Sequence, residues 1–335
     1  MAATSRGPFR IGIAGAAGVL AEELLRTLVT REFPVARLRL FESDDRLGSD
    51  MGFGSSILPM ETLSDETLES LDIIVFAGPA SVTEEWGAQA AESGLAVLDF
   101  STPPRPGTVR VSQLGGRVPA GAPVQVPSAT AAILALVIAP LQQAGFRIER
   151  LRVAASLSLS EAGREGIEAL SGETRQLLAM ETPEANARYR GRLAFNVVPG
   201  AQMPGAADPE KRAADELAEL IGVERARVSV MSSFVPVFYG NTYAVELETT
   251  PRLDPAELGD LLEAAGRVEI CDEGGDRLLP PLASEFVGRE EFGVGRIRAT
   301  GTGIQFWVAA DNVRVVADNG IRLLEQLLGL ETTEN

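Results

Sequence analysis

The most constraining feature of this chain is a glycine-rich turn between its first predicted strand and its first predicted helix. Arg10–Ala14 is a short apolar strand, and Gly15-Ala16-Ala17-Gly18 leads into a predicted helix over 19–30 with leucines on one side. Small residues in such a turn let a pyrophosphate approach the N–H groups that begin the helix. Because the turn joins a first strand to a first helix, it predicts dinucleotide binding. The alternative is an ordinary tight turn that binds no nucleotide.

Strands and helices continue to alternate through the N-terminal half of the chain. Further strands are predicted over 37–41, 72–77 and 95–99. A helix between the last two is predicted to begin at a capping box, Ser81-Val82-Thr83-Glu84, and to end near Gly94. This alternation is typical of a parallel, doubly wound sheet, so we expect a Rossmann-type domain over residues 8–129.

The pattern changes after Pro127. Thr130–Leu141 is almost wholly apolar and predicts a buried helix, and longer strand-like runs follow over 150–159, 227–238, 242–249 and 303–309. Helices are predicted after Asp208-Pro209, where the helix ends before Gly222, and after Asp254-Pro255. These elements indicate an α+β domain over 130–311 with a mixed or antiparallel sheet and helices on one face. An amphipathic helix over about 312–328 is expected to pack back on the first domain as part of a C-terminal segment, 312–330. The stretch from Pro103 to Pro123 is interpreted as a surface loop.

Charge and hydropathy exclude several function classes. The net charge is −17 and the isoelectric point is near 4.6, a balance that repels nucleic acid and anionic membrane surfaces. No apolar run approaches the ~20 residues of a membrane span, and Met1–Pro8 lacks the apolar core of a secretory signal. We therefore expect a cytoplasmic protein that binds neither nucleic acid nor membrane.

Two counts limit the chemistry further. The chain contains no histidine, which excludes Ser-His-Asp and Cys-His catalysis and histidine-ligated zinc. It contains one cysteine, Cys271, so neither a disulfide nor a cysteine-rich metal site forms within one chain, and we expect no metal site. Cys271 ends a strand-like segment that begins at Arg267 and is expected to be a buried structural residue.

The end of the second strand bears on the choice of cofactor. Glu42-Ser43-Asp44-Asp45-Arg46 places carboxylates where they accept from the ribose 2′-hydroxyl of NAD and repel the 2′-phosphate of NADP. NAD is therefore expected over NADP, the alternative being a solvated acidic loop. The candidate cofactor-binding residues are Gly15, Ala17, Gly18, Val19, Leu20, Glu42, Ser43, Ala77 and Gly78.

Several ordered motifs over nearly the whole chain resemble the aspartate-semialdehyde dehydrogenase family. They are the glycine turn with its helix, Asp72-Ile-Ile-Val-Phe-Ala-Gly78, Leu98-Asp-Phe-Ser-Thr-Pro-Pro-Arg105, Ala162-Gly-Arg-Glu-Gly-Ile-Glu-Ala-Leu170, Phe195-Asn-Val-Val-Pro199 and Asp311-Asn-Val-Arg314. The resemblance implies a Rossmann domain, a dimerisation domain of the semialdehyde dehydrogenase type, and a homodimer. It also implies oxidation of a semialdehyde to an acyl phosphate through a cysteine thioester, with a histidine as acid/base.

The residues that the resemblance implies for this chemistry are absent here. The nucleophilic cysteine of "N-P-N-C-S/T" falls on Ala129, and the substrate glutamine of "T-Y-Q-A-V-S-G-A-G" falls on Leu157. The arginine and histidine of "R-V-P-V-x-x-G-H-S" fall on Phe234 and Asn241, and an NADP-phosphate arginine falls on Asp45. Arg105 matches a phosphate-binding arginine and is retained, the alternative being a structural rather than a phosphate-binding role.

Substitute nucleophiles are not evident. Ser128 and Thr130 flank Ala129 but lack an adjacent base, and Ser156, Ser158 and Ser160 alternate at strand spacing, which favours hydrogen bonding across a sheet. The chain is thus similar to a Usg-1-like branch of the family without the catalytic cysteine and histidine. We expect an inactive homologue with a regulatory or binding role. The alternatives are an NAD(P)-dependent oxidoreductase that acts on a semialdehyde or related amino-acid intermediate by non-covalent chemistry, and a partner that forms mixed dimers with an active dehydrogenase.

Overall fold

The chain folds into two compact units, each with its own sheet. The computed structural model describes residues 7–43, 49–101, 123–183, 189, 191–200, 208–273 and 277–330. One unit comprises Met1–Pro127 together with Val316–Asn335, and the other comprises Ser128–Val315. The sequence stretch 103–122, with Arg105, and the acidic residues Asp44 and Asp45 lie outside the described residues.

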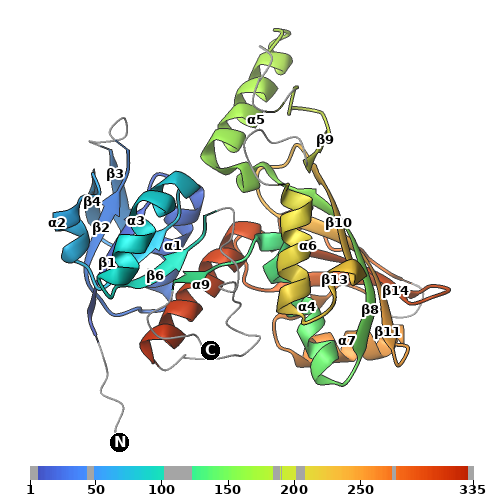
Figure 1. Cartoon of the computed structure of the whole chain (residues 1–335). Coiled ribbons are helices and arrows are strands. Elements are labelled where there is room, and N and C mark those ends of the chain that lie inside the picture. The colour runs from blue at the N-terminus through green and yellow to red at the C-terminus, as the bar shows by residue number, and fades with distance from the viewer. Residues whose placement is uncertain are drawn as a thin grey trace, which may run out of the picture. The chain divides into compact units, whose positions relative to one another are not determined.

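The sheet of the first unit has seven strands in the order β3-β4-β2-β1-β5-β6-β7 (Figure 1). Their bounds are β1 Phe9–Ala14, β2 Val35–Phe41, β3 Asp50–Phe53, β4 Ser56–Glu61, β5 Ile73–Phe76, β6 Ala96–Asp99 and β7 Val124–Gln125. All neighbours pair in parallel except β3 and β4, which form an antiparallel hairpin at one edge. The parallel, doubly wound sheet predicted from the alternation is confirmed.

Strand β1 lies at the point where the strand order reverses. Its neighbours are β2 on one side and β5 on the other, so the turns that follow β1 and β5 meet at the same edge of the sheet. Strand β5 is buried along its whole length, as a strand covered on both faces must be. Ligands of open α/β sheets bind outside the carboxyl ends of the strands at such a reversal.

Helices α1 (Val19–Thr30), α2 (Asp65–Glu69) and α3 (Ala80–Glu92) belong to the first unit. Helix α1 has the predicted bounds. The predicted capping box of α3 is wrong, because the helix begins one residue before Ser81, with Pro79 as its N-cap and no side-chain cap. Proline has the φ that a helix entrance needs, and Ser81 therefore lies inside the first turn. The helix ends as expected before Gly94, which has a φ of 77°.

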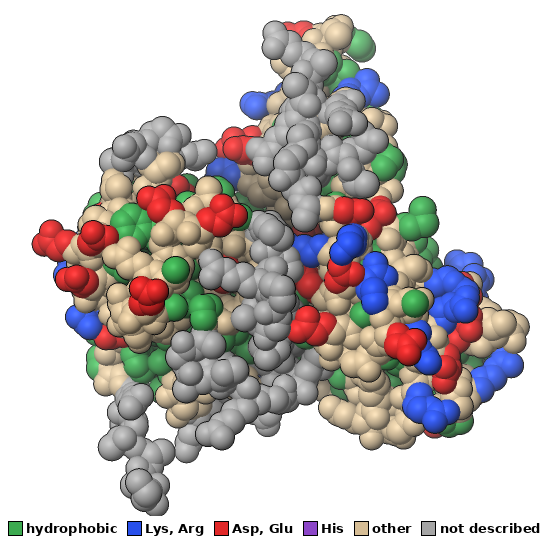
Figure 2. Space-filling view, in the orientation of Figure 1, with side chains coloured by type: hydrophobic (Ala, Val, Ile, Leu, Met, Phe, Trp, Pro, Cys, Tyr) green, Lys and Arg blue, Asp and Glu red, His purple; other side chains and the backbone are tan. Residues whose placement is uncertain are grey.

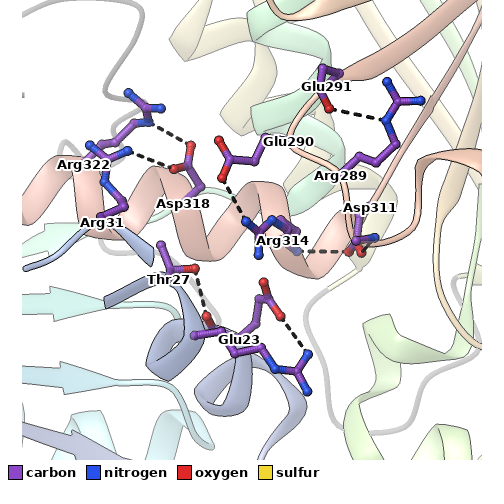
Figure 3. A network of polar contacts seen from close by, with 12 residues as sticks. Glu23, Thr27, Arg31, Arg289, Glu290, Glu291, Asp311, Arg314, Asp318 and Arg322 are labelled. Carbon is purple, nitrogen blue, oxygen red and sulfur yellow. Dashed lines mark hydrogen bonds and ion pairs between the residues drawn. The ribbon is translucent and has the colours of Figure 1, made fainter. Parts of the chain in front are cut away.

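The last helix, α9 (Asn312–Leu328), has the predicted bounds and contributes most of its length to the first unit. Its Gly320 lies against Phe100, because a Cβ built there would come within 2.4 Å of the phenyl ring. Arg31, the residue that follows α1, pairs with Glu325 of α9 at 2.6 Å and with Asp318 at 3.6 Å, and Asp318 also pairs with Arg322 at 2.8 Å. Figure 3 shows Arg31 and Arg322 pointing toward Asp318. These ion pairs tie α9 to α1.

The sheet of the second unit is mixed, as predicted. Its strand order is β12-β13-β14-β11-β8-β10-β9. The bounds are β8 Arg147–Leu157, β9 Val198–Pro199, β10 Val228–Phe234, β11 Asn241–Thr250, β12 Val268–Ile270, β13 Phe292–Ala299 and β14 Ile304–Ala310. Strand β8 pairs in parallel with β10 and antiparallel with β11.

Helices cover one face of this sheet. They are α4 (Ala129–Gln143), α6 (Pro209–Leu220) and α7 (Pro255–Ala264), and α5 (Gly163–Leu178) and α8 (Ala283–Phe286) complete the unit (Figure 1). Helix α4 is buried along most of its length, and the predicted caps Asp208 and Asp254 accept hydrogen bonds from the first turns of α6 and α7. In the central strands β8 and β11, buried residues alternate with partly exposed ones, so the other face of the sheet is open within the described part of the chain.

Candidate functional site

The predicted nucleotide-binding turn lies at the reversal point of the first sheet. Gly15 has a φ of +83°, and a Cβ built on it would lie 2.3 Å from the Cα of Gly78, at the end of β5. The two turns therefore approach each other more closely than any side chain allows. The backbone N–H of Gly15 donates to the carbonyl of Phe41 at the end of β2. Three strand ends thus converge on this turn.

The start of α1 is shaped to receive an anion. Gly18 is the N-cap residue and makes no side-chain cap to the first N–H groups of the helix. The residues expected to contact a pyrophosphate, Val19 and Leu20, form the first turn of α1 behind Ala17 and Gly18. Orphan N–H groups and the helix dipole together favour a phosphate at this position. The cradle therefore fits a dinucleotide.

Glu42 faces this turn. One of its carboxylate oxygens accepts from the backbone N–H of Ala17 at 3.0 Å, and the other accepts from the N–H of Ser43 at 3.0 Å. The structure thus brings together the predicted residues Ala17, Glu42 and Ser43, while Ala77 donates its N–H to Ala14 beside them. A negative charge is placed beside the glycine turn.

The four positions where the resemblance implies lost catalytic or substrate residues all lie in the second unit. Leu157 and Phe234 are the last residues of β8 and β10, they are partners in the parallel register, and both are 6% exposed. Asn241 is the first residue of β11, and Ala129 is the first residue of α4. Asn241 is 0% and Ala129 is 4% exposed.

Asn241 is the centre of a buried polar cluster at this end of the sheet. Its Oδ1 accepts from the backbone N–H of Ser158 at 2.9 Å and from the Ser158 hydroxyl at 3.1 Å. Its Nδ2 donates to Glu161 Oε1 at 2.7 Å and to Tyr243 Oη at 3.1 Å. An amide has two donor hydrogens and two acceptor lone pairs, so all four are used. The backbone N–H of Ser158 fixes which end of the amide carries the oxygen.

Neighbouring residues extend this cluster toward α4. Tyr243 also forms a side-chain hydrogen bond with Thr130, and burial raises the pKa of Tyr243 well above its usual value, with the charge of Glu161 as a further cause. Thr130 directly follows Ala129, so the cluster reaches the first turn of α4. The backbone N–H of Ser128, the N-cap of that helix, donates to Glu216 at 2.8 Å, and Glu216 accepts from Arg212 at 2.7 Å.

Asn312, at the start of α9, completes the cluster. Its Oδ1 lies within hydrogen-bond distance of the Ser158 and Ser160 hydroxyls and of the N–H of Gly240. Of the three serines predicted to alternate along a strand, Ser156 lies in β8, but Ser158 and Ser160 lie beyond its end at Leu157, Ser160 in the short helix η3 (Leu159–Ala162). The hydroxyls of Ser158 and Ser160 bond to each other at 2.9 Å and to asparagine side chains that the sequence spacing does not relate to them.

Glu161 is the functional group that the sequence reasoning missed. It lies on η3 with part of its surface open to solvent, yet protein atoms surround its carboxyl group. This burial raises the pKa of Glu161, while the Asn241 amide, Arg212 and the Asn312 amide act in the opposite direction. The sequence did contain a sign of this residue, because in segment 155–163 Glu161 stands where the family pattern "T-Y-Q-A-V-S-G-A-G" has glycine.

Cysteine and lysine each occur once in the chain, and both residues lie outside the polar cluster around Asn241. Cys271 is half-buried rather than buried as expected, and partial burial together with the charges of Glu269, Glu285 and Asp272 raises its pKa to about 11. It is therefore a thiol near neutral pH. Lys211 is exposed on α6 and pairs with Asp215 at 2.6 Å. Within the described part of the chain, no three His, Cys, Asp or Glu residues are arranged to hold a metal ion.

The first unit has a glycine cradle at the reversal point of a parallel sheet, and the second has a mixed sheet with a polar cluster at its strand ends. Together these features define a two-domain protein of the nucleotide-dependent dehydrogenase class. Family models agree: "Semialdehyde dehydrogenase, NAD binding domain" matches residues 10–165, and "Semialdehyde dehydrogenase, dimerisation domain" matches residues 138–315. The chain belongs to the semialdehyde dehydrogenase family. Among the described residues, no helix is long and apolar enough to cross a bilayer.

Similar proteins extend over the whole chain. A USG-1 protein homolog of Pseudomonas aeruginosa is 31% identical, over 96% of this chain and 98% of the relative. Aspartate-semialdehyde dehydrogenase 2 of Vibrio cholerae is 28% identical, over 96% and 98%. The crystal structure of aspartate semialdehyde dehydrogenase II from Vibrio cholerae complexed with ASA has a TM-score of 0.87 at 27% identity and covers 97% of this chain and 99% of its own. The fold predicted from the sequence is confirmed.

Proposed function

We propose that this chain is an aspartate-semialdehyde dehydrogenase homologue that lacks the phosphorylating dehydrogenase reaction and has a regulatory or binding role. The observation that carries the proposal is the residue at the start of α4. The resemblance assigns the thiolate nucleophile to this position, and here it is Ala129, a methyl group that is 4% exposed. A methyl group neither attacks an aldehyde nor carries an acyl group.

The position assigned to the acid/base argues in the same direction. Asn241 does not titrate, and its four hydrogen-bonding groups are all engaged within the cluster. Phe234 and Leu157 replace the two groups assigned to substrate binding. Removal of a nucleophile or a base from a covalent enzyme costs on the order of 10⁶ in turnover, and both are missing here.

A dehydrogenase assay tests this proposal. Purified protein is incubated with aspartate semialdehyde, phosphate and NAD or NADP, and formation of the reduced nucleotide is followed by absorbance. We expect no turnover above the uncatalysed rate. Turnover at about a hundredth of a typical kcat of ~10 s⁻¹ would contradict the proposal. An active dehydrogenase of the family serves as the positive control.

NAD is the nucleotide that we propose for the first unit. The Glu42 carboxylate beside the glycine turn suits the ribose hydroxyls of NAD and repels the 2′-phosphate of NADP. Calorimetric titration with both nucleotides is the direct test, with NAD expected to bind more tightly. Glu42→Gln is expected to reduce this preference, and NADP binding that is tighter than NAD and insensitive to salt would contradict it.

The open face of the second sheet is the surface that we propose for a homodimer. It carries Met231, 72% exposed, and Trp307, 36% exposed, beside a cavity of about 380 Å³ lined by Arg152, Arg296, Arg298 and Glu246 among others. Figure 2 shows Lys and Arg side chains gathered on the part of the second unit where β8, β11 and β14 lie in Figure 1. The dimerisation-domain match spans these strands, which favours a second copy as the occupant.

A mixed dimer with an active dehydrogenase is the alternative occupant of this face. Co-expression of the two chains with different tags distinguishes the two assemblies. Recovery of the active enzyme through the tag of this chain supports the mixed dimer, and recovery of this chain alone supports the homodimer.

A second function, an oxidoreductase without a covalent intermediate, is favoured by one observation. Glu161 is a partly exposed residue whose enclosed carboxyl group has a raised pKa, the property of an acid/base group that works near neutral pH. Consumption of NADH or NADPH with a panel of aldehydes, abolished in Glu161→Gln, would support this function over a purely binding role.

A further inference from the structure

The open face of the second sheet is built of rows of side chains that cross its strands. Strands β14, β11, β8 and β10 lie side by side in this order (Figure 1). Residues that pair across neighbouring strands project from the same face, and so do residues two apart along one strand. The strand register therefore gives a charged row, Arg298, Gln305, Glu246 and Arg152, and beside it an apolar row, Trp307, Ala244, Ala154 and Met231.

The side chains of the charged row have polar partners within one copy of the chain. Arg298 donates to Gln305 at 2.8 Å, and Arg152 donates to Glu246 at 3.0 Å and to Glu248 at 3.2 Å. An anionic ligand at Arg152 would compete with two carboxylates that already occupy its guanidinium group. The charged row is therefore suited to the polar rim of an interface rather than to an anion-binding site.

The apolar row has large side chains at its ends and small ones between them. Trp307 and Met231 are 36% and 72% exposed, and only the methyl groups of Ala244 and Ala154 separate them. All four residues line the cavity of about 380 Å³ on this face. We call the hollow over Ala154 and Ala244 the alanine furrow. A volume of this order is enough for a bicyclic aromatic ring.

A second copy of the chain supplies such a ring. The dimerisation-domain match covers residues 138–315 and includes every strand of these rows. In a two-fold dimer each contact occurs twice, because both copies use the same surface. Trp307 lies one strand from Ala244 and two strands from Ala154, about 5 and 10 Å away across the sheet. A two-fold axis that passes between the indole and the furrow therefore brings each indole over the furrow of the other copy.

From this arrangement we infer that Trp307 of each copy packs into the alanine furrow of the other copy and sets the register of the dimer. This inference rests on the homodimer proposed above and names the contact that holds it. Tryptophan in a desolvated pocket is the side chain that most often dominates the energy of a protein interface. The two alanines are needed because a larger side chain at either position would fill the space that the indole occupies.

Tryptophan fluorescence tests the contact in the intact chain. The chain has two tryptophans, Trp86 of α3 and Trp307, so Trp86→Phe leaves Trp307 as the only indole. Emission and acrylamide quenching of this variant are measured over a dilution series whose dimer fraction is known from sedimentation equilibrium. We expect the emission maximum to move to longer wavelength and quenching to increase as the dimer dissociates.

The outcomes of this experiment separate the inference from the proposal on which it rests. A dimer in which Trp307 is quenched as readily as in the monomer overturns the inference and leaves the homodimer standing. A chain that is monomeric throughout the series overturns both. The proposed loss of dehydrogenase activity is judged on turnover, which this experiment does not use.

A double-mutant cycle tests whether the indole and the furrow touch. We expect Trp307→Ala to raise the dimer dissociation constant at least about 30-fold, the scale of an interface hot spot, and Ala154→Leu to raise it about tenfold by filling the furrow. In the double variant the leucine has no indole to exclude, so its effect should fall well short of the product of the single effects. Strictly multiplicative effects would overturn the contact. Ala256→Leu, an exposed alanine change on α7, is the matched control and should leave the dissociation constant unchanged.

Discussion

At the residue scale, all four hydrogen-bonding groups of Asn241, the position that the resemblance assigns to the acid/base, are engaged within the cluster. A histidine at this position would need a free ring nitrogen to exchange a proton with a substrate. The Asn241 amide instead uses both donor hydrogens and both acceptor lone pairs in hydrogen bonds with Ser158, Glu161 and Tyr243. This arrangement supports the proposal that Asn241 organises the strand ends and takes no part in proton transfer.

Restoring the nucleophile alone is expected not to restore turnover. In Ala129→Cys, a thiol at the first position of α4 benefits from the helix dipole, so it should react with iodoacetamide in mass spectrometry. Without an acid/base, dehydrogenase activity should stay at least about 10²-fold below that of an enzyme with both groups. The control is Cys271, whose raised pKa predicts slow labelling in the parent chain. Substantial turnover by Ala129→Cys would contradict the role assigned to Asn241.

Glu161→Gln is expected to stabilise the protein at neutral pH. Burial raises the pKa of Glu161 in the folded chain, so the charged form destabilises the fold. This cost is fully present above the folded-state pKa and disappears below the ordinary carboxyl value. The melting temperature of the variant should therefore exceed that of the wild type at pH 7 to 8, and the difference should shrink as the pH falls toward ~4. A difference that is independent of pH would contradict this origin.

At the element scale, regular helices and strands were predictable and the site contacts were not. The bounds of α1 and α9 follow from their spacing of apolar residues, and those of α6 from Asp208 and Pro209. The hairpin of β3 and β4 was missed because its strands are short and mostly exposed, which leaves no apolar alternation. Glu161 was missed because its partner Asn241 lies 80 residues away, a distance that no local pattern spans.

The close approach of the β1 and β5 turns predicts a severe effect of a small substitution. In Gly15→Ala the new Cβ would overlap the backbone of Gly78, which has no flexible atom to move aside. We expect loss of nucleotide binding and destabilisation by more than about 2 kcal/mol, measured by calorimetry and denaturant unfolding. The control is Gly94→Ala, which shares a positive φ but meets nothing within 4 Å, and should cost only about 1 kcal/mol.

The ion pairs between Arg31 and α9 predict that two arginine-to-alanine variants differ in how much stability they lose. Arg31→Ala leaves Asp318 and Glu325, whose side chains are 2% and 7% exposed, without that partner. Losing one partner of a buried ion pair costs about 3–5 kcal/mol, so the denaturation midpoint should fall clearly. Arg26→Ala removes a pair on the same helix whose arginine is 71% exposed, and its effect should lie within about 0.5 kcal/mol. Equal effects of the two variants would refute the assignment.

At the scale of the whole molecule, the acidic composition and the arginine-lined face of the second sheet have opposite effects on self-association. The net charge of −17 keeps molecules apart in general. The open face combines Arg152, Arg296 and Arg298 with Glu246, Met231 and Trp307, so one surface offers both signs of charge and apolar area. Such a surface allows self-association that the average charge opposes.

Met231→Glu tests the proposed dimer. A carboxylate placed at the centre of an interface loses its hydration, so we expect a shift from dimer to monomer, read by sedimentation velocity. The control is Ile57→Glu on the β4 strand of the first unit, where the native side chain is 74% exposed. This control should leave the sedimentation coefficient unchanged. A wild-type chain that sediments as a monomer at micromolar concentration would exclude the dimer.

Helix α9 has a consequence for how the chain is made. The first unit needs residues up to Pro127 and also Val316 onward, since Phe100 packs against Gly320 and Arg31 pairs with Glu325. A ribosome synthesises the strands of the parallel sheet first and α9, which packs against this unit, much later. The surface of the first unit that α9 covers therefore stays exposed while the second unit, Ser128–Val315, is synthesised. We therefore expect that the incomplete first unit exposes apolar surface during translation, a condition that favours aggregation until α9 has been made.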